Sequence, residues 1–257
     1  MSAPEFLTTA QSRRIAYHRT RGTAPASVPG VVFLGGLKSD MQGTKATHLE
    51  GLAGIRGLDF LRFDYSGHGE SSGAFTDGCI GDWAEDAAEA IGALTEGPQI
   101  LIGSSMGGWV SLLMARQMPE RIAGLITIAA APDFADAMQA EFTPEQRQEM
   151  EQTGQVARPS DYSDEPYIIT RRLIEDGFEQ RVLDRPLDLP FPVRMLQGTA
   201  DTDVDMSVAL RLLDHAQGPD IRLELLKGAD HRFSDTQALA ALEQALDEVL
   251  TLARARG

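Results

Sequence analysis

The 257-residue sequence predicts an α/β fold: a mostly parallel central sheet with helices on both faces and a helical lid insertion. Two observations support this expectation. Short, almost continuous apolar runs, typical of parallel strands buried on both faces, alternate with segments of helical periodicity. The alternation stops at residue 133 and resumes after residue 190, where three prolines close the interruption. We therefore expect a single domain over residues 1–257 with the lid at residues 133–190.

Each element can be placed along the chain from its local pattern. Alternating apolar and polar residues predict an antiparallel hairpin at the start. Runs of branched apolar residues predict the later strands, and apolar residues three or four positions apart predict the helices. The expected strands are 6–9, 14–18, 31–34, 58–64, 99–103, 122–128, 193–196 and 221–226; the expected helices are 45–52, 82–94, 109–116, 134–152, 165–177, 206–215 and 234–253.

The segment at 133–190 is polar and helical, and no strong strand signal occurs within it. Insertions of this length between two strand–helix units are uncommon and often functional. We interpret the segment as a lid over a site, with a purely structural helical layer as the alternative.

Composition narrows the possible classes of function. The formal net charge of −15 is unfavourable for partners that need a basic face, which argues against nucleic acid and anionic membrane surfaces. No apolar run approaches the ~20 residues of a membrane span, and no secretory signal is recognised at the start. The single cysteine fits a reducing compartment. These features predict a cytoplasmic protein.

Residues 99–116 have the pattern of a nucleophile elbow. Gly103-Ser-Ser-Met-Gly107 is a G-x-S-x-G between a predicted strand and a predicted helix. Such a turn holds a serine hydroxyl above the sheet, and its flanking residues must be small because the turn is strained. The free N–H groups at the start of the following helix would face a developing oxyanion. This context indicates Ser105 as the nucleophile.

Two other candidate nucleophiles lack this context. A second G-x-S-x-G, from Gly69 to Gly73, also follows a predicted strand but leads into a segment without helical period. Ser71 is therefore interpreted as a loop serine. Cys79 lies in the same glycine-containing loop and is an unfavourable thiol nucleophile.

The acid that orients the base is expected before the histidine, because elbow folds order the three residues serine, acid, histidine. Asp201 directly follows a predicted strand and its glycine, at the sheet edge expected to carry Ser105. Asp203 lies two residues further along this loop and is the alternative acid. Asp230, adjacent to the candidate base, is interpreted as a loop carboxylate.

The base is chosen from five histidines. His231 follows the predicted strand at 221–226 and so reaches the carboxyl edge of the sheet. His68 lies in a tight loop near the same edge, but it precedes the serine in the chain. The sequence therefore predicts His231 as the base.

An oxyanion hole needs two backbone N–H groups near the nucleophile. We expect one from Met106, directly after the serine, and one from Leu37, where Gly35-Gly36 lets the backbone approach closely. The sequence contains no zinc-protease motif, no cysteine cluster and no phosphate- or dinucleotide-binding glycine motif. Neither a metal nor another cofactor is expected.

Five stretches carry a family resemblance. They are Arg62-Phe-Asp-Tyr-Ser-Gly67, Gly97-Pro-Gln-Ile-Leu-Ile-Gly-Ser-Ser-Met-Gly-Gly-Trp109, Gly43-Thr-Lys-Ala46, Asp230-His-Arg232 and, in the lid, Tyr162-Ser-Asp-Glu165. On these residues the sequence resembles the α/β-hydrolases along nearly its whole length. Within them it is similar to the mitochondrial palmitoyl-protein thioesterases, a group also described as acyl-glucuronide esterases. The resemblance implies a catalytic triad of Ser105, Asp201 and His231. The lack of a recognisable transit peptide predicts a cytoplasmic relative of that group.

The expected function is hydrolysis of carboxylic esters or thioesters through an acyl-enzyme on Ser105. The substrate would be a small molecule or an acylated protein, and apolar lid residues would either line an acyl slot or only pack the lid. Two alternatives stay open: a homologue that binds a small molecule without turnover, and a peptidase or carbon–carbon bond hydrolase with the same triad. The acyl group, the leaving group and the oligomeric state are not determined by the sequence.

Overall fold

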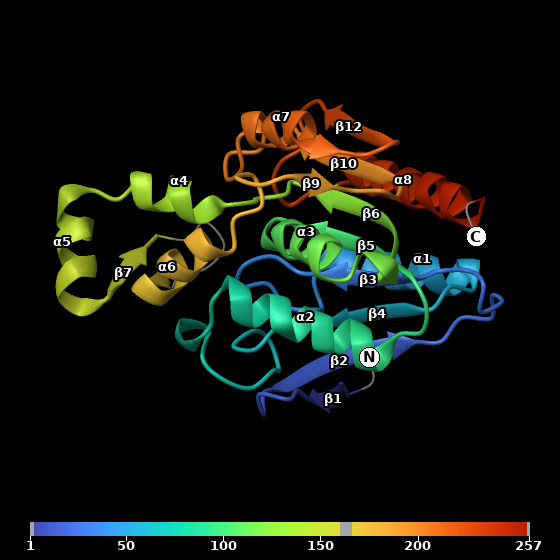
Figure 1. The fold of residues 1–257 in the computed structure, drawn as a ribbon, viewed down its shortest axis with the longest axis horizontal. Helices are drawn as coiled ribbons and strands as arrows, with labels where there is room; N and C mark the ends of the chain where they lie inside the picture. The colour runs from blue at the N-terminus through green and yellow to red at the C-terminus, as the bar shows by residue number, and fades with distance from the viewer. Residues whose placement is uncertain (1–2, 160–165, 256–257) are drawn as a thin grey trace.

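The centre of the computed structural model, which describes residues 3–159 and 166–255, is an eight-stranded mixed sheet (Figure 1). From edge to edge its strands are β1 (Glu5–Thr8), β2 (Arg14–Thr20), β4 (Phe60–Phe63), β3 (Gly30–Leu34), β5 (Gln99–Ser104), β6 (Ile122–Ile128), β10 (Val193–Gly198) and β12 (Ile221–Leu226). The pairs β1–β2 and β2–β4 are antiparallel, and the pairs from β4 across to β12 are parallel. The predicted α/β class with a mostly parallel sheet is confirmed.

Helices cover both faces of this sheet and bury two hydrophobic clusters. The first face carries α1 (Thr44–Arg56) and α8 (Thr236–Arg254); the second carries α2 (Ile80–Leu94), α3 (Met106–Gln117) and α7 (Met206–His215). Trp83 and Trp109 are fully buried on the second face, and Phe233 is fully buried on the first. The middle strands are buried on both sides, which explains their continuous apolar sequences.

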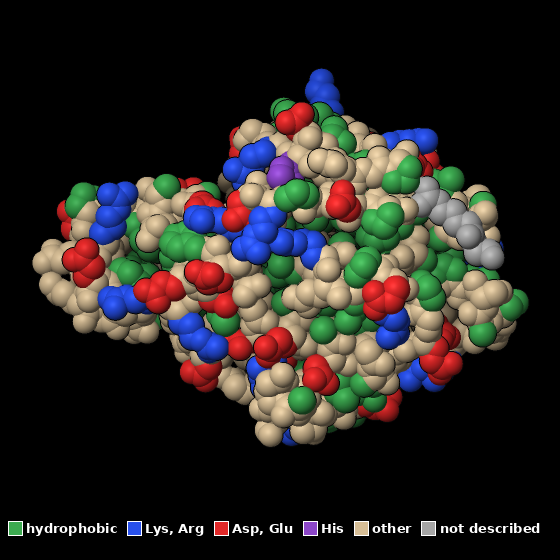
Figure 2. Space-filling view, in the orientation of Figure 1, with side chains coloured by type: hydrophobic (Ala, Val, Ile, Leu, Met, Phe, Trp, Pro, Cys, Tyr) green, Lys and Arg blue, Asp and Glu red, His purple; other side chains and the backbone are tan. Residues whose placement is uncertain are grey.

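Between β6 and β10 the chain leaves the sheet and forms the insertion at 133–190, for which we keep the name lid. Its elements are α4 (Phe134–Ala140), α5 (Pro144–Thr153), β7 (Gln155–Arg158), β8 (Tyr167–Thr170), α6 (Arg171–Glu179) and β9 (Leu187–Asp188), and β9 pairs with β11 (Ala216–Gln217). The lid projects from one end of the main body, as the ribbon and the space-filling view both show (Figures 1 and 2). On the face drawn in Figure 2, acidic and basic side chains are interspersed. Two short 3₁₀ turns, η1 (Phe75–Asp77) and η2 (Pro119–Arg121), complete the described elements.

The interior of the lid differs from the sequence prediction. The expected helix at 134–152 is two helices, because Thr143 accepts a hydrogen bond from the Gln146 N–H and Pro144 begins a new helix there. Within the described part of the expected helix at 165–177, Tyr167–Thr170 form β8, paired antiparallel with β7, and the helix begins at Arg171. The motif at 162–165 lies outside the described residues.

The base of the lid is fastened to the body at several points. Asp133, buried after β6, accepts hydrogen bonds from the N–H groups of Val182 (2.8 Å) and Leu183 (3.0 Å). It thus joins the segment where the chain enters the lid to the segment where it returns to the sheet. Asp176 of α6 accepts a hydrogen bond from the N–H of Gly81 at the start of α2 (2.8 Å). The lid is therefore hydrogen-bonded to the main body near the sheet edge.

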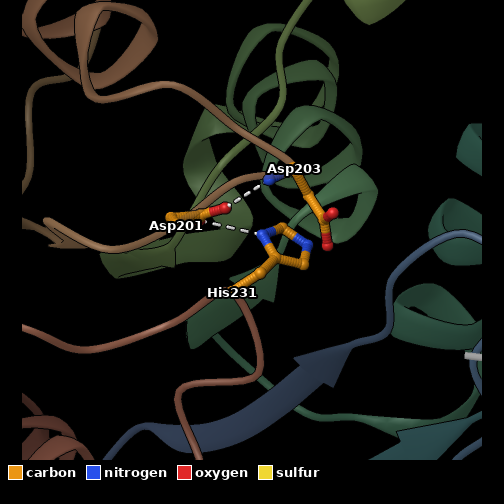
Figure 3. A group of neighbouring side chains, drawn as sticks. All are labelled: Asp201, Asp203 and His231. Atoms are coloured by element: carbon orange, nitrogen blue, oxygen red, sulfur yellow. Dashed lines mark hydrogen bonds and ion pairs between the residues drawn. The ribbon is translucent and has the colours of Figure 1, made fainter. Parts of the chain in front are cut away.

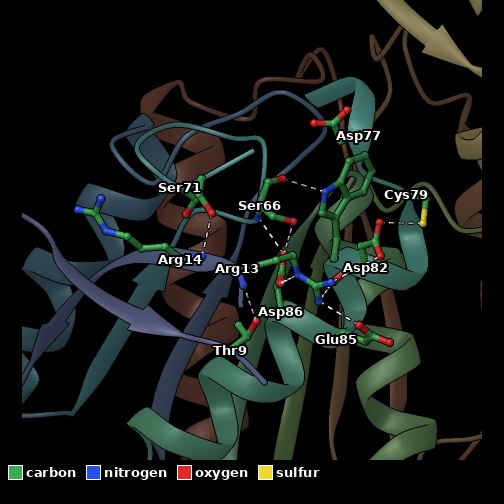
Figure 4. Close-up of polar contacts among 12 residues, drawn as sticks. Thr9, Arg13, Arg14, Ser66, Ser71, Asp77, Cys79, Asp82, Glu85 and Asp86 are labelled. Carbon is green, nitrogen blue, oxygen red and sulfur yellow. Dashed lines mark hydrogen bonds and ion pairs between the residues drawn. The ribbon is translucent and has the colours of Figure 1, made fainter. Parts of the chain in front are cut away.

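A polar cluster fastens the N-terminal hairpin to α2 (Figure 4). Arg13 lies between the two strands of the hairpin and donates to buried Asp86 (2.6 Å) and to Glu85 (3.0 Å). The second carboxylate oxygen of Asp86 accepts from both the N–H and the hydroxyl of Ser66. Among the described residues, no helix has the length and apolar character needed to cross a membrane.

Candidate active site

Ser105 occupies the sharp turn between β5 and α3. Its backbone has φ 55° and ψ −118°, a conformation that costs a non-glycine residue about 1–3 kcal/mol. The turn is held by neighbouring strands, since the Ser105 N–H donates to the Ile128 carbonyl (2.9 Å) and the Ala131 N–H donates to the Ser105 carbonyl (3.1 Å). The strand–turn–helix geometry places Ser105 at the carboxyl edge of the parallel sheet.

The two glycines of the motif are required by contacts of the backbone. A Cβ on Gly103 would lie 2.3 Å from the Gly107 carbonyl oxygen, and a Cβ on Gly107 would lie 2.1 Å from the Leu34 carbonyl oxygen. Both distances are far below any van der Waals contact, and the opposing atoms belong to rigid backbone. The motif is therefore the sequence signature of an elbow whose backbone passes within contact distance of β3.

Asp201 and His231 are hydrogen-bonded to each other at the same edge. The loops that carry them follow β10 and β12, which are parallel neighbours, and His231 Nδ1 lies 2.9 Å from Asp201 Oδ2. The other carboxylate oxygen accepts from the N–H groups of Asp203 and Val204, both at 2.9 Å. Burial alone would raise the pKa of Asp201, but the hydrogen bonds from His231 and the backbone lower it below its usual value.

Asp203, the alternative acid, has a different position. Its carboxylate lies on the other side of the imidazole from Asp201 (Figure 3). One ligand-type atom from each of Asp201, Asp203 and His231 lies within 4.8 Å of the other two. Since Asp201 and His231 already use their facing atoms on each other, this group has the geometry of an oriented base with a second carboxylate nearby.

Ser105 and His231 meet in one cleft of about 670 Å³. Within the described part of the chain, no hydrogen bond joins the Ser105 hydroxyl to the imidazole. Such bonds are often long before substrate is present and tighten in the complex. The structure thus brings Asp201 and His231 into direct contact, and Ser105 lines the same cleft as His231.

The loop after β3 supplies the second wall around the serine. A Cβ on Gly36 would lie 3.4 Å from Ser105 Cβ, so this backbone passes close to the elbow. Among the described residues, the N–H groups of Leu37 and Met106 donate no hydrogen bond and remain available for an oxygen in the cleft. Lys38, the next residue along, has a positive φ of 55°, which marks the tight bend of this loop.

The cleft lies between the sheet edge and the lid and combines two kinds of lining. The lid contributes apolar side chains, and charged side chains of both signs line the rest, the acidic ones being Asp40, Glu141 and Asp203. The apolar lid residues are Phe134, Ala137, Met138, Tyr167 and Ile169, and the cationic residues are Lys38, Lys45, Arg158 and Arg232.

Gln197 is a site residue that the sequence reasoning missed. It is fully buried at the end of β10, and its Nε2 donates to Asp201 Oδ2 (3.1 Å) and to the Val204 carbonyl (3.0 Å). The amide therefore donates to the same carboxylate oxygen that contacts His231 Nδ1. A polar residue at the carboxyl end of a predicted strand, directly before the glycine that precedes the Asp201 loop, was the available signal.

The structure gives the competing residues other roles. Ser71 Oγ donates to the Asp64 carbonyl (2.7 Å) and accepts from the Ala16 N–H (2.8 Å), so it fastens a loop. His68 is buried among aromatic rings, and burial lowers its pKa to about 4. Burial raises the pKa of the Cys79 thiol to about 12, which disfavours a thiolate.

Known proteins are similar to this chain in sequence and in fold. Residues 24–173 match the family model described as alpha/beta hydrolase fold. The chain is 34% identical over 246 residues to the mitochondrial palmitoyl-protein thioesterase ABHD10 of Rattus norvegicus, covering 95% of this chain and 82% of the relative. A structure of mouse alpha/beta hydrolase domain-containing protein 10 has a TM-score of 0.88 and 33% identity, covering 97% and 99% of the two chains. A hydrolase structure from Agrobacterium vitis S4 has a TM-score of 0.92 and 37% identity, covering 96% and 98%.

These relatives correct one expectation and confirm another. The rat, mouse and human relatives are named as mitochondrial proteins, so the cytoplasmic location predicted from the sequence is wrong. That prediction rested only on signals that were not recognised, whereas the similarity to mitochondrial proteins extends over 95% of this chain. The family resemblance is confirmed on the same grounds. The chain belongs to the alpha/beta hydrolase fold family.

Proposed function

We propose that this protein is a serine hydrolase that cleaves carboxylic esters or thioesters through an acyl-enzyme on Ser105. The observation that carries the proposal is the pairing of a strained elbow serine with the Asp201–His231 hydrogen bond at one sheet edge. A serine hydroxyl is a weak nucleophile, and it needs a base that a third group orients.

The residues divide the reaction between them as follows. His231 takes the proton of Ser105 through Nε2 as the oxygen attacks the acyl carbonyl. Asp201 keeps the other ring nitrogen protonated and stabilises the imidazolium that forms. The N–H groups of Leu37 and Met106 stabilise the negative oxygen, a contribution of about 3–4 kcal/mol for each donor. The imidazolium then protonates the leaving alcohol or thiol, and water attacks the acyl-enzyme with His231 again as the base.

The lining of the cleft is an argument for an acylated substrate. The lid wall offers apolar contacts for an acyl chain, as apolar pockets generally do. Relatives over most of the chain are named palmitoyl-protein thioesterases, and a thioester reacts through the same tetrahedral intermediate as an ester. We infer that the natural substrate is a small molecule or a protein that carries an acyl group on oxygen or sulfur.

Labelling with a fluorophosphonate probe tests the nucleophile directly. The probe should label the wild-type protein at one serine, and Ser105→Ala should lose both the label and the hydrolysis of p-nitrophenyl acetate. Ser71→Ala is the matched control, because it removes the other motif serine, and it should keep the label. A folded wild-type protein that neither reacts with the probe nor hydrolyses esters and acyl thioesters would be a binding protein and would refute the proposal.

A further inference from the structure

Lys45 places a positive charge at the N-terminal end of a helix, where the helix dipole disfavours it. It lies in the first turn of α1, where the helix dipole favours negative charge, and that turn contains no acidic residue to balance it. It lines the cleft together with Ser105 and His231. A residue placed against its local preference is often retained for a function elsewhere.

The Lys45 ammonium reaches the loop that carries His231. Its Nζ donates a hydrogen bond to the carbonyl oxygen of Arg232, the residue directly after the histidine. This loop is tightly bent, with a positive φ of 51° at Phe233 and of 83° at Gly228, and the Lys45 contact adds to the hydrogen bonds that the loop makes with itself and with Thr199. The contact therefore ties the histidine loop to a helix that precedes it by 187 residues in the chain.

The helix that carries Lys45 is itself held in place. His48 pairs with Glu243 (2.8 Å) and Arg56 pairs with Asp247 (2.5 Å), so α1 is tied to α8 along its length. Lys45 therefore extends from a helix that is paired with α8. Through its hydrogen bond, the position of this helix helps to set the position of the Arg232 carbonyl.

Charged groups surround the Lys45 ammonium. Asp230 and Arg232 face it from the histidine loop, and Asp201 faces it from the loop after β10, where Asp203 adds a further carboxylate beside the imidazole. Burial lowers the pKa of Lys45 to about 8, although Asp230 and Asp201 oppose that shift. At neutral pH the ammonium is therefore still mostly charged and offsets part of the negative charge around the imidazole.

We propose that Lys45 is a positioning residue for the acid–base pair: its ammonium holds the Arg232 carbonyl, and its charge balances the carboxylates around His231. The inference rests on the proposed function of Ser105 and His231. It predicts two separable effects, one from the hydrogen bond and one from the charge. Loss of the hydrogen bond lowers the rate, and loss of the charge makes the imidazole easier to protonate.

The two effects can be read from pH profiles of kcat/KM on a p-nitrophenyl ester. In Lys45→Met both are lost, so kcat/KM should fall about tenfold or more at pH 7. The acidic limb, which reports protonation of the base, should move to higher pH by about half a unit or more. Lys45→Gln keeps a donor for the Arg232 carbonyl but not the charge, and should show the shifted limb with a smaller loss of rate. Lys45→Arg keeps the charge and should leave the limb where it is in the wild type.

Two further variants separate this role from general damage. Lys227→Met removes the same charge from an exposed lysine next to the histidine loop, and its limb should not move. In Lys45→Met/Asp230→Asn one cation and one carboxylate are lost together, so the limb should return towards the wild-type position.

An acidic limb that stays in place in both Lys45→Met and Lys45→Gln would overturn the inference. So would a limb that moves equally in Lys45→Arg. Fluorophosphonate labelling distinguishes these outcomes from failure of the proposed function, because the wild-type protein must label at Ser105 before the variants are compared. If Lys45→Met does not fold, Lys45→Gln tests the same loss of charge.

Discussion

Asp201 Oδ2 and His231 Nδ1 lie 2.9 Å apart although thirty residues of chain separate them. They meet because β10 and β12 are parallel neighbours whose carboxyl ends open onto one edge of the sheet. The same edge carries Ser105, through β5 and the turn that follows it. The contact holds Nδ1 of a ring whose residue lines the cleft, and it leaves Nε2 as the nitrogen that the proposed reaction uses.

The first prediction separates the two aspartates of this loop. Asp201→Asn should lower kcat by about 10⁴, because an amide stabilises the wrong tautomer of the imidazole and no longer balances its charge. Asp203→Asn should lower kcat by about tenfold at most, since Asp201 is the residue that holds Nδ1. Steady-state kinetics on an activated ester would measure both values. Equal losses in the two variants would show that the orienting acid has been misassigned.

Sequence reasoning predicted the elbow turn and the neighbouring loops of Asp201 and His231 because each has a local signature. A strained serine turn requires small flanking residues, so Gly103 and Gly107 are visible in the sequence itself. Asp201 and His231 follow from chain order and from the rule that parallel strands open their sites at carboxyl ends. The α/β class and the mostly parallel sheet were predicted correctly in the same way, from short-range patterns of apolar residues.

The contacts made by Gln197 and Lys45 could not be predicted, since they are set by tertiary structure. Neither residue carries a motif, and Lys45 meets the Arg232 carbonyl only when α1 packs beside the histidine loop. The β7–β8 hairpin of the lid was missed for a different reason. Short apolar runs such as Tyr167–Thr170 fit a strand or a helix equally well, and periodicity alone does not decide between them.

A second prediction concerns the close approach of the elbow to β3. Gly107→Ala should reduce the free energy of unfolding by about 2–4 kcal/mol, because the added methyl group must displace the backbone of Leu34. Gly92→Ala is the matched control: it lies in α2 with nothing within 4 Å of the added Cβ and should be stabilising by about 0.5–1 kcal/mol. Urea titrations followed by fluorescence would give both values. The prediction fails if Gly107→Ala is as stable as the wild type.

A third prediction concerns stability in acid. His68 is 3% exposed, and burial lowers its pKa to about 4, with a smaller opposing effect from the Ser66 carbonyl. The unfolded chain binds this proton near pH 6.5, so the contribution of the neutral ring is complete above pH 6.5 and is lost as pH falls towards 4. The loss should reach about 3 kcal/mol. Unfolding free energies at pH 7 and pH 4.5 would measure it, and in His68→Gln the difference between them should shrink by most of that amount. An unchanged difference would mean that the imidazole is not a source of acid sensitivity.

The last prediction tests whether the lid wall contacts an acyl chain. Ala137 faces the cleft from α4, and Ala140 lies at the end of the same helix and does not line the cleft. Ala137→Phe should narrow the slot and lower kcat/KM for p-nitrophenyl octanoate by more than about tenfold, with a much smaller effect on the acetate. Ala140→Phe adds the same bulk outside the cleft, so its ratio of octanoate to acetate activity should match that of the wild type. If Ala137→Phe lowers both activities equally, the apolar lid residues serve to pack the lid and the acyl chain lies elsewhere.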